Sequence, residues 1–280
     1  MSKVNTCGAQ EALKKKGVAT PTGQTGRRAW GDKNVNIVLG CPNRCRYCYA
    51  RAMAKCYGRI RDRDEWGTTY FRLGQKGLVH KRWTDFGTAR FPTTHDITPE
   101  FLEECVAVVR NLLAGGNRVT VCSKPRLDCI RRLCREFADN RESLEFRFTI
   151  GAMDDDILRF WEPGAPGFKE RFDSLKLAFR KGFRVSVNIE PMLDAPRIMK
   201  LFRKLAPYGN VFINIGIMRN IRQNTQPRTQ EEEAKVRRIE ENQADDRIRA
   251  IYEDLKGEPL VRWSPEIRKV LGIENPKPCG

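Results

Sequence analysis

The chain has 280 residues, of which 40% are hydrophobic and 31% charged, enough for one large domain with a substantial core. It contains no apolar run long enough for a membrane helix, and residues 1–12 lack the apolar stretch of a signal peptide, so we expect a cytoplasmic protein. The net charge of +17 favours a polyanionic partner such as nucleic acid, or else reflects a basic, solvated surface.

The first 34 residues are polar and basic and show no clear period, so we expect a basic N-terminal arm over 1–34. From residue 35 onward, strand patterns alternate with helical patterns, which is typical of βα units around a parallel sheet. The predicted strands are 35–40, 87–92, 117–123, 144–150, 183–190 and 211–217. Helices are expected over about 46–56, 98–114, 127–137, 168–181, 195–206 and 229–255. We expect a core over 35–225, with a C-terminal helix and tail, 226–280, packing on it.

Two of the predicted strands alternate strictly between apolar and polar residues. In 144–150 the even positions are apolar, while Thr149 stands on the polar face; in 183–190 the polar face carries Asn188 and Glu190. A strand buried on both faces of a parallel sheet would be almost wholly apolar. We therefore expect a complete or incomplete barrel, with helices outside and an enclosed polar lumen inside.

An insertion, 58–86, interrupts the alternation between the first helix and the second strand. It mixes five aromatic residues with seven lysines and arginines. Such a mixture either stacks on a nucleotide chain or forms a small subdomain that packs on the mouth of the barrel. We favour the subdomain.

Three of the ten cysteines, Cys41, Cys45 and Cys48, lie within eight residues, after the first predicted strand. Cysteine-rich cytoplasmic chains use thiolates for metal or redox chemistry more than for disulfides. Thiolates hold iron–sulfur clusters or zinc. Structural zinc takes four ligands, and the nearest candidates, Cys56 and His80, lie at no recognised spacing. An iron–sulfur cluster with one iron left open is therefore favoured over zinc.

The motif Cys41-x3-Cys45-x2-Cys48, with Tyr47 before the last cysteine, resembles that of the radical S-adenosylmethionine (SAM) superfamily. Its extended form, Gly-Cys-Pro-Asn-Arg-Cys-Arg-Tyr-Cys-Tyr-Ala-Arg, is similar to the branch that contains spore photoproduct lyase. Less specific matches stand at 121–124, 148–151, 162–171 and 187–191, so the resemblance covers about residues 35–220.

The resemblance implies an α/β fold, a partial (β/α)6 barrel with the cluster at its mouth. It also implies that the three cysteines hold a [4Fe–4S] cluster whose open iron binds S-adenosylmethionine. Reductive cleavage of that cofactor forms a 5′-deoxyadenosyl radical, with an external one-electron donor such as flavodoxin or ferredoxin.

The same resemblance assigns roles to residues around the cofactor. It implies that Tyr47 packs near the adenine, and that Lys124 and Thr149 help to hold the cofactor. Asn188 and Glu190 are implied to contact the ribose or the substrate. An enclosed lysine needs an anion, and a cofactor carboxylate would satisfy Lys124.

Spore photoproduct lyase carries a hydrogen-donating cysteine in the region similar to 91–96, where this chain has Thr93 and Thr94. We therefore do not infer photoproduct repair for this chain from the resemblance. Cys122 either takes the donor's part from another direction or is a small core residue. His95, at the end of the second strand, either orients substrate or moves a proton, or makes a loop hydrogen bond.

Three functions follow from these patterns. The first is a radical SAM enzyme of lyase type acting on a nucleic acid or modified nucleoside. The second applies the same chemistry to a peptide or small metabolite. The third is a non-catalytic, zinc-containing nucleic-acid-binding protein.

Overall fold

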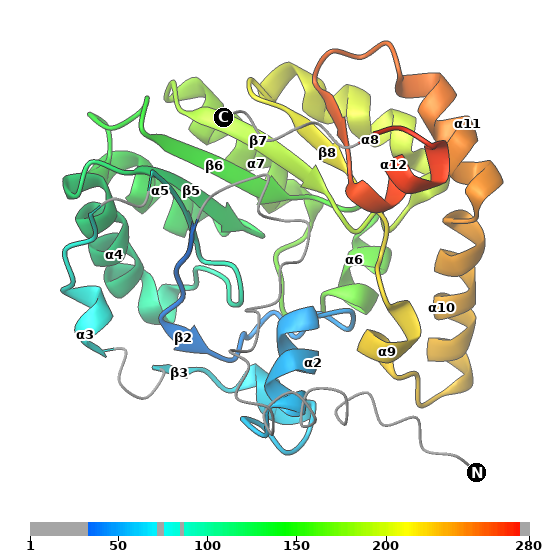
Figure 1. Ribbon diagram of the computed structural model, residues 1–280, viewed down its shortest axis with the longest axis horizontal. Helices are drawn as coiled ribbons and strands as arrows, with labels where there is room; N and C mark the ends of the chain where they lie inside the picture. Colours follow the sequence, from blue (N-terminus) through cyan, green and yellow to red (C-terminus); the bar gives the residue numbers. More distant parts are fainter. Residues whose placement is uncertain (1–32, 72–75, 85–86, 275–280) are drawn as a thin grey trace.

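The computed structural model describes residues 33–71, 76–84 and 87–274. Strands and helices alternate along most of it (Figure 1). The strands are β1 (Lys33–Asn34), β2 (Val38–Leu39), β3 (Tyr70–Phe71), β4 (Thr88–Phe91), β5 (Arg118–Ser123), β6 (Leu144–Thr149), β7 (Arg184–Ile189), β8 (Ile213–Ile215) and β9 (Val261–Trp263). The helices are α2 (Tyr49–Cys56), α3 (Lys76–Val79), α4 (Leu102–Ala114), α5 (Leu127–Glu136), α6 (Asp155–Trp161), α7 (Phe168–Arg180), α8 (Ile198–Leu205), α9 (Ile221–Thr225), α10 (Gln230–Asn242), α11 (Asp245–Leu255) and α12 (Pro265–Leu271).

The main sheet has seven strands in the order β1-β4-β5-β6-β7-β8-β9, and every neighbouring pair is parallel. Parallel neighbours need crossover connections, which α4, α5, α7 and α8 supply between the central strands. The sheet is open between β1 and β9. The predicted α/β fold with a partial barrel is therefore confirmed, with an additional strand, β9, that the sequence pattern did not predict.

The two faces of the central strands differ as the alternation predicts. Phe146, Phe148 and Val187 are completely buried among the apolar residues that pack under the helices. On the opposite face Arg147 and Ser186 are also buried, and Arg147 Nε donates to Ser186 Oγ over 3.1 Å. The polar face predicted from the sequence, which we call luminal, is therefore present and buried at these positions.

The predicted first strand, 35–40, is a strand only at β2 in the structure, and β1 lies just before it. β1 pairs with β4 in the main sheet, whereas β2 pairs antiparallel with β3 in a separate ribbon. Between them side chains replace the strand ladder: Asn36 Oδ1 accepts from the backbone nitrogens of Thr93 and Thr94, at 2.7 and 2.8 Å. His95 Nε2 accepts from the Ile37 nitrogen at 3.3 Å. With these groups satisfied away from the ladder, the chain leaves the sheet before the cysteines.

The insertion packs against the cysteine loop. Ile60 and Trp66 are buried in a small core with Leu39, Cys41 and Ala54. The described part of the insertion therefore packs beside the cysteine loop, while a separate subdomain stays a prediction; α2, β2 and β3 gather at one end of the molecule (Figure 1). Parts of the predicted insertion, of the arm over 1–34 and of the C-terminal tail lie outside the described residues.

The predicted helix 229–255 is two helices, α10 and α11, and the break stands at Gln243. There the side chain of Gln243 accepts from the Met218 nitrogen at 2.9 Å and donates to the Met192 carbonyl at 3.1 Å. These contacts anchor the turn to the loops after β7 and β8, so the chain returns to form β9 and α12. In the ranges that the structure describes, no helix combines the length and apolar character needed to span a bilayer.

Candidate active site

The loop between β2 and α2 carries the three cysteines. Cys41 and Cys45 are buried, while Cys48 is half-buried and caps α2, its Sγ accepting from the Arg51 nitrogen at 3.4 Å. The helix therefore begins at Tyr49, three residues later than the sequence pattern predicts. No cysteine within the described ranges forms a disulfide.

Two glycines allow other segments to approach this loop closely. Gly40 has a φ of +89°, and a Cβ placed there would lie 2.0 Å from the Thr68 carbonyl oxygen of the insertion. A Cβ on Gly164 would lie 2.0 Å from the Pro42 carbonyl oxygen, and the Gly164 nitrogen donates to the Asn43 carbonyl at 3.1 Å. Only glycine leaves space for these contacts, which hold the cysteine loop between the insertion and residues 162–166.

The Asp96 carboxylate joins the cysteine loop to the end of β5. Its Oδ2 accepts from Asn43 Nδ2 at 2.8 Å and from the Lys124 nitrogen at 2.9 Å. Its Oδ1 accepts from the Ile97 nitrogen at 2.9 Å and from the Ser123 hydroxyl. Four donors saturate this carboxylate, so Asp96 positions the loop. The sequence pattern singled out the pair His95-Asp96, with a role in orienting substrate or moving a proton rather than in holding the loop.

A buried carboxylate, Glu162, lies beside the cysteines. Its Oε2 is 2.5 Å from Arg171 Nη2, and both side chains are completely inaccessible to solvent. Lys124 Nζ lies 3.9 Å from Oε1, and the Tyr47 hydroxyl donates to the same oxygen. Burial by itself would raise the pKa of Glu162, but Arg171 and Lys124 outweigh it and the pKa is lowered. Glu162 is therefore ionised at neutral pH and orders Tyr47 and Lys124 together.

Arg171 connects this carboxylate to the lumen. Its Nε donates to the Pro166 carbonyl at 2.7 Å and its Nη1 donates to the Thr149 carbonyl at 3.3 Å. The sequence shows Glu162 and Arg171 only as members of a weak motif. One signal was available: an arginine within the apolar stripe of α7 needs a buried partner.

The structure places Thr149 and Asn188 side by side at the carboxyl ends of β6 and β7, because the two residues are paired in register. Glu190 follows on the same side, and its Oε2 accepts from Asn214 Nδ2 at 3.0 Å. Tyr47 and Lys124 meet at Glu162, with Lys124 Nζ 5.7 Å from the centre of the Tyr47 ring. The five residues predicted to meet the cofactor or substrate therefore lie at the carboxyl ends of the strands or on the cysteine loop.

Cys122 and His95 have different surroundings. Cys122 lies one layer deeper in the lumen, paired in register with Arg147, and its Sγ is 3.9 Å from the Thr120 carbonyl. His95 is buried, with Nε2 on the Ile37 nitrogen and Nδ1 3.0 Å from the Asp96 carbonyl. These contacts give His95 a structural role, and a catalytic role for either residue stays a prediction.

The donor set of the loop fits an iron–sulfur cluster. Burial raises the pKa of Cys45 to about 12, and that of Cys41 is raised by burial and by Asp96. Lys124 lies near Cys45, and Arg51 lies near Cys48. These positive charges can balance the thiolates that form when metal binds. No three His, Cys, Asp or Glu side chains within the described ranges form a site for a single ion. Cluster ligands bind different irons and stand farther apart than the ligands of one ion.

Comparison with known proteins agrees with this site. The model of the radical SAM superfamily matches residues 35–196. The chain is 23% identical over 184 residues to the uncharacterized protein MJ0683 of Methanocaldococcus jannaschii, covering 64% of this chain and 67% of that protein.

Two solved structures have a similar fold. Streptococcus suis SuiB bound to the precursor peptide SuiA has a TM-score of 0.54 at 10% identity, over 94% of this chain and 53% of that one. A mutant of spore photoproduct lyase with bound AdoMet and a dinucleoside spore photoproduct has a TM-score of 0.50 at 13% identity, over 83% of this chain and 75% of that one. The chain thus spans about half the length of SuiB, and at these identities the likeness concerns the fold alone.

Proposed function

Since the chain belongs to the radical SAM superfamily, we propose that Cys41, Cys45 and Cys48 hold its [4Fe–4S] cluster. The protein is an enzyme whose cofactors are that cluster and S-adenosylmethionine. When bound and reduced, the cluster supplies the electron that cleaves the cofactor to a 5′-deoxyadenosyl radical. The observation that carries the assignment is a single loop of three free thiols, anchored at the carboxyl edge of the sheet.

Lys124 is the residue proposed to hold the cofactor carboxylate. Its side chain is 16% exposed, so the ammonium group is enclosed but reachable. Burial by itself would lower its pKa, but the neighbouring Cys45 and Glu162 raise it, so the residue is a cation at neutral pH. In this proposal Tyr47 packs on the adenine, and Thr149 and Asn188 form hydrogen bonds with the ribose from the luminal side.

For the substrate, we favour a nucleic acid or a modified nucleoside. The net charge is +17. The strand register places three arginines, Arg90, Arg147 and Arg184, on the luminal face, against two carboxylates, Glu190 and Glu145, and Glu145 pairs with Arg147 at 2.8 Å. This excess of cations favours an anionic group such as a phosphodiester. A lyase reaction would agree with the likeness to spore photoproduct lyase, with Glu190 and His95 near the substrate and Cys122 as the candidate hydrogen donor.

A peptide or small metabolite is the second candidate. It is favoured by the likeness to SuiB, whose structure was solved with a precursor peptide. The same luminal cations would then meet acidic side chains or a carboxylate terminus.

The reaction needs an external one-electron donor, such as flavodoxin or ferredoxin, in a cytoplasmic setting. The end of α2 presents Met53 and Tyr57, which are 47% and 55% exposed. Lys55, Arg59 and Arg61 are exposed close by in the sequence, and the Arg59 guanidinium lies 5.5 Å from the centre of the Tyr57 ring. A basic rim around exposed apolar groups suits an acidic electron carrier, and α2 begins at a proposed cluster ligand.

Anaerobic purification tests the cluster assignment, with about four iron and four sulfide expected per chain. With dithionite and S-adenosylmethionine, 5′-deoxyadenosine should form in the wild type. Cys45→Ala should form none, whereas Cys56→Ala, an exposed thiol outside the loop, should match the wild type. Zinc in place of iron after reconstitution, or full activity in Cys45→Ala, would contradict the proposal.

The substrate class is tested by comparing DNA, tRNA, modified nucleosides and peptides in the same assay. A substrate should accelerate 5′-deoxyadenosine formation and transfer deuterium from one labelled position into it. Retention of DNA or RNA should weaken steeply with salt. Acceleration by peptides alone, with no retention of nucleic acid at low salt, would favour the second candidate.

A further inference from the structure

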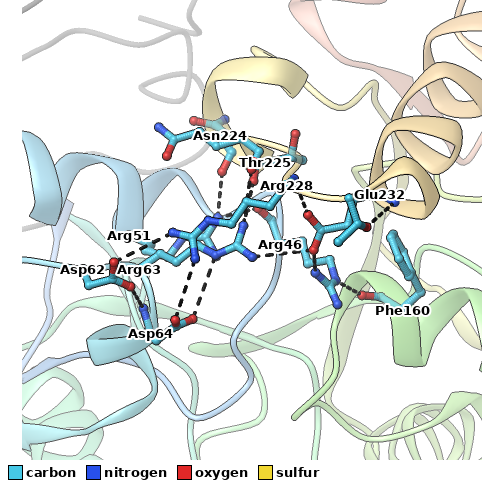
Figure 2. A network of polar contacts seen from close by, with 12 residues as sticks. Arg46, Arg51, Asp62, Arg63, Asp64, Phe160, Asn224, Thr225, Arg228 and Glu232 are labelled. Carbon is cyan, nitrogen blue, oxygen red and sulfur yellow. Dashed lines mark hydrogen bonds and ion pairs between the residues drawn. The ribbon is translucent and has the colours of Figure 1, made fainter.

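Arg46, in the middle of the cysteine loop, is held from both sides by distant segments. Its Nε donates to the Phe160 carbonyl at 2.7 Å, and its Nη1 donates to Glu232 Oε1 in the first turn of α10 (Figure 2). Its backbone nitrogen donates to the Trp161 carbonyl at 2.8 Å. Because Arg46 directly follows Cys45 and stands two residues before Cys48, a shift of Arg46 would move two of the three thiols.

Two further arginines meet the same C-terminal segment. Arg51, from α2, donates through Nη2 to the Arg46 carbonyl at 2.6 Å and to the Asn224 carbonyl at 2.7 Å. Arg63, from the insertion, donates to the Thr225 carbonyl at 3.3 Å and lies 3.5 Å from Glu232 Oε1 (Figure 2). The cysteine loop, α2 and the insertion therefore all contact residues 221–232.

Glu232 is the carboxylate at the centre of these contacts. Its side chain is 14% exposed, and its Oε2 accepts from the Arg228 nitrogen at 2.7 Å. Burial would raise its pKa, but the Arg228 amide and the guanidinium groups of Arg46 and Arg63 lower it, so it is ionised at neutral pH. Without this charge the guanidinium groups of Arg46 and Arg63 would face each other at the base of the loop.

We propose that Glu232 is a positioning residue for the cysteine loop and acts through Arg46 and Arg63. The C-terminal helices then complete the active site. The inference rests on the proposed role of the three cysteines. It gives α10, which lies far from the cysteine motif in the sequence, a role in positioning the cysteine loop.

The test compares Glu232→Gln with Glu231→Gln, an exposed neighbour in the same first turn. Both changes remove one negative charge beside the same helix terminus, so dipole and net-charge effects are matched. We expect Glu232→Gln to lose iron to a chelator on the order of tenfold faster than the wild type, the factor for about one charge-assisted hydrogen bond. The electron paramagnetic resonance signal of its reduced cluster with S-adenosylmethionine should also change. Glu231→Gln should match the wild type in both measurements.

A second measurement needs no iron. In iron-free protein, amide hydrogen exchange over residues 44–56 should be faster in Glu232→Gln than in Glu231→Gln. If the wild type binds no iron, the proposed function fails, while the exchange comparison still tests the link to the loop. Equal exchange and equal iron retention in the two variants would overturn the inference.

Should Glu232→Gln not fold, Arg46→Lys provides a milder change. It keeps the charge but not the forked donors that reach both Phe160 and Glu232. We expect it to lose iron faster than the wild type, and wild-type retention would again overturn the inference.

Discussion

The Glu162→Gln substitution tests the role of the buried carboxylate beside the cysteines. The change keeps the size of the side chain but removes its charge. Arg171, which is completely buried, and Lys124, which is 16% exposed, then face each other without a counter-ion. Tyr47 also loses a charged acceptor.

The magnitude follows from the distances. At an effective dielectric constant of about 20, the 2.5 Å contact with Arg171 contributes about 6–7 kcal/mol and the 3.9 Å contact with Lys124 about 4 kcal/mol. Desolvation of the ions offsets much of this, but breaking a buried pair leaves a charge uncompensated and costs about 3–5 kcal/mol. At about 2–4 °C for each kcal/mol, the melting temperature should fall by about 6–20 °C.

Urea unfolding of the iron-free protein, followed by circular dichroism at pH 7, measures this loss directly. The control is Glu142→Gln, an exposed carboxylate, which should change the free energy of unfolding by less than about 0.5 kcal/mol. A loss below about 1 kcal/mol for Glu162→Gln would refute the reasoning, because it would mean that the buried cations need no counter-ion.

The pH dependence of stability provides a second test of the charge on Glu162. The folded-state pKa of Glu162 is lowered, so its contribution is complete above the unfolded value of about 4.3 and is lost as the pH falls through the folded value. The difference in stability between wild type and Glu162→Gln should therefore narrow below about pH 4.3. A difference that stays constant there would contradict the assigned ionisation.

Three further outcomes are expected. Gly164→Ala places a Cβ 2.0 Å from the Pro42 carbonyl oxygen and should reduce the iron content of the protein. Gly257→Ala, which has open space around its Cβ position, should not. Equal iron contents in the two variants would contradict the packing argument. Lys124→Met should raise the KM for S-adenosylmethionine by about 10–100-fold in the 5′-deoxyadenosine assay, the range for a lost charged hydrogen bond, and an unchanged KM would exclude the carboxylate role. Arg59→Glu should slow reduction by an acidic electron carrier but leave the dithionite-driven reaction unchanged, and equal slowing of both would argue against docking at α2.

Much of this molecule is determined by local patterns in its sequence. Alternation along 144–150 and 183–190 predicts one apolar and one polar strand face, because successive side chains of a strand point to opposite sides. The three cysteines within eight residues identify a loop for metal or redox chemistry, and the likeness of their motif to that of the radical SAM superfamily implies the cofactors. Fold class and the polar strand face therefore follow from near neighbours along the chain, and the cofactor class follows from a motif that is equally local.

Only the tertiary structure decided how that loop is held and how its charges are balanced. Glu232 and Arg46 are 186 residues apart in the sequence, and Asp96 reaches Asn43 across 53 residues. The shortening of the predicted first strand to β2 likewise depends on Asn36 and His95 meeting groups beyond the strand. Buried charges and hydrogen-bonding groups need partners, but which distant residue supplies each partner is set by the packing of the whole fold.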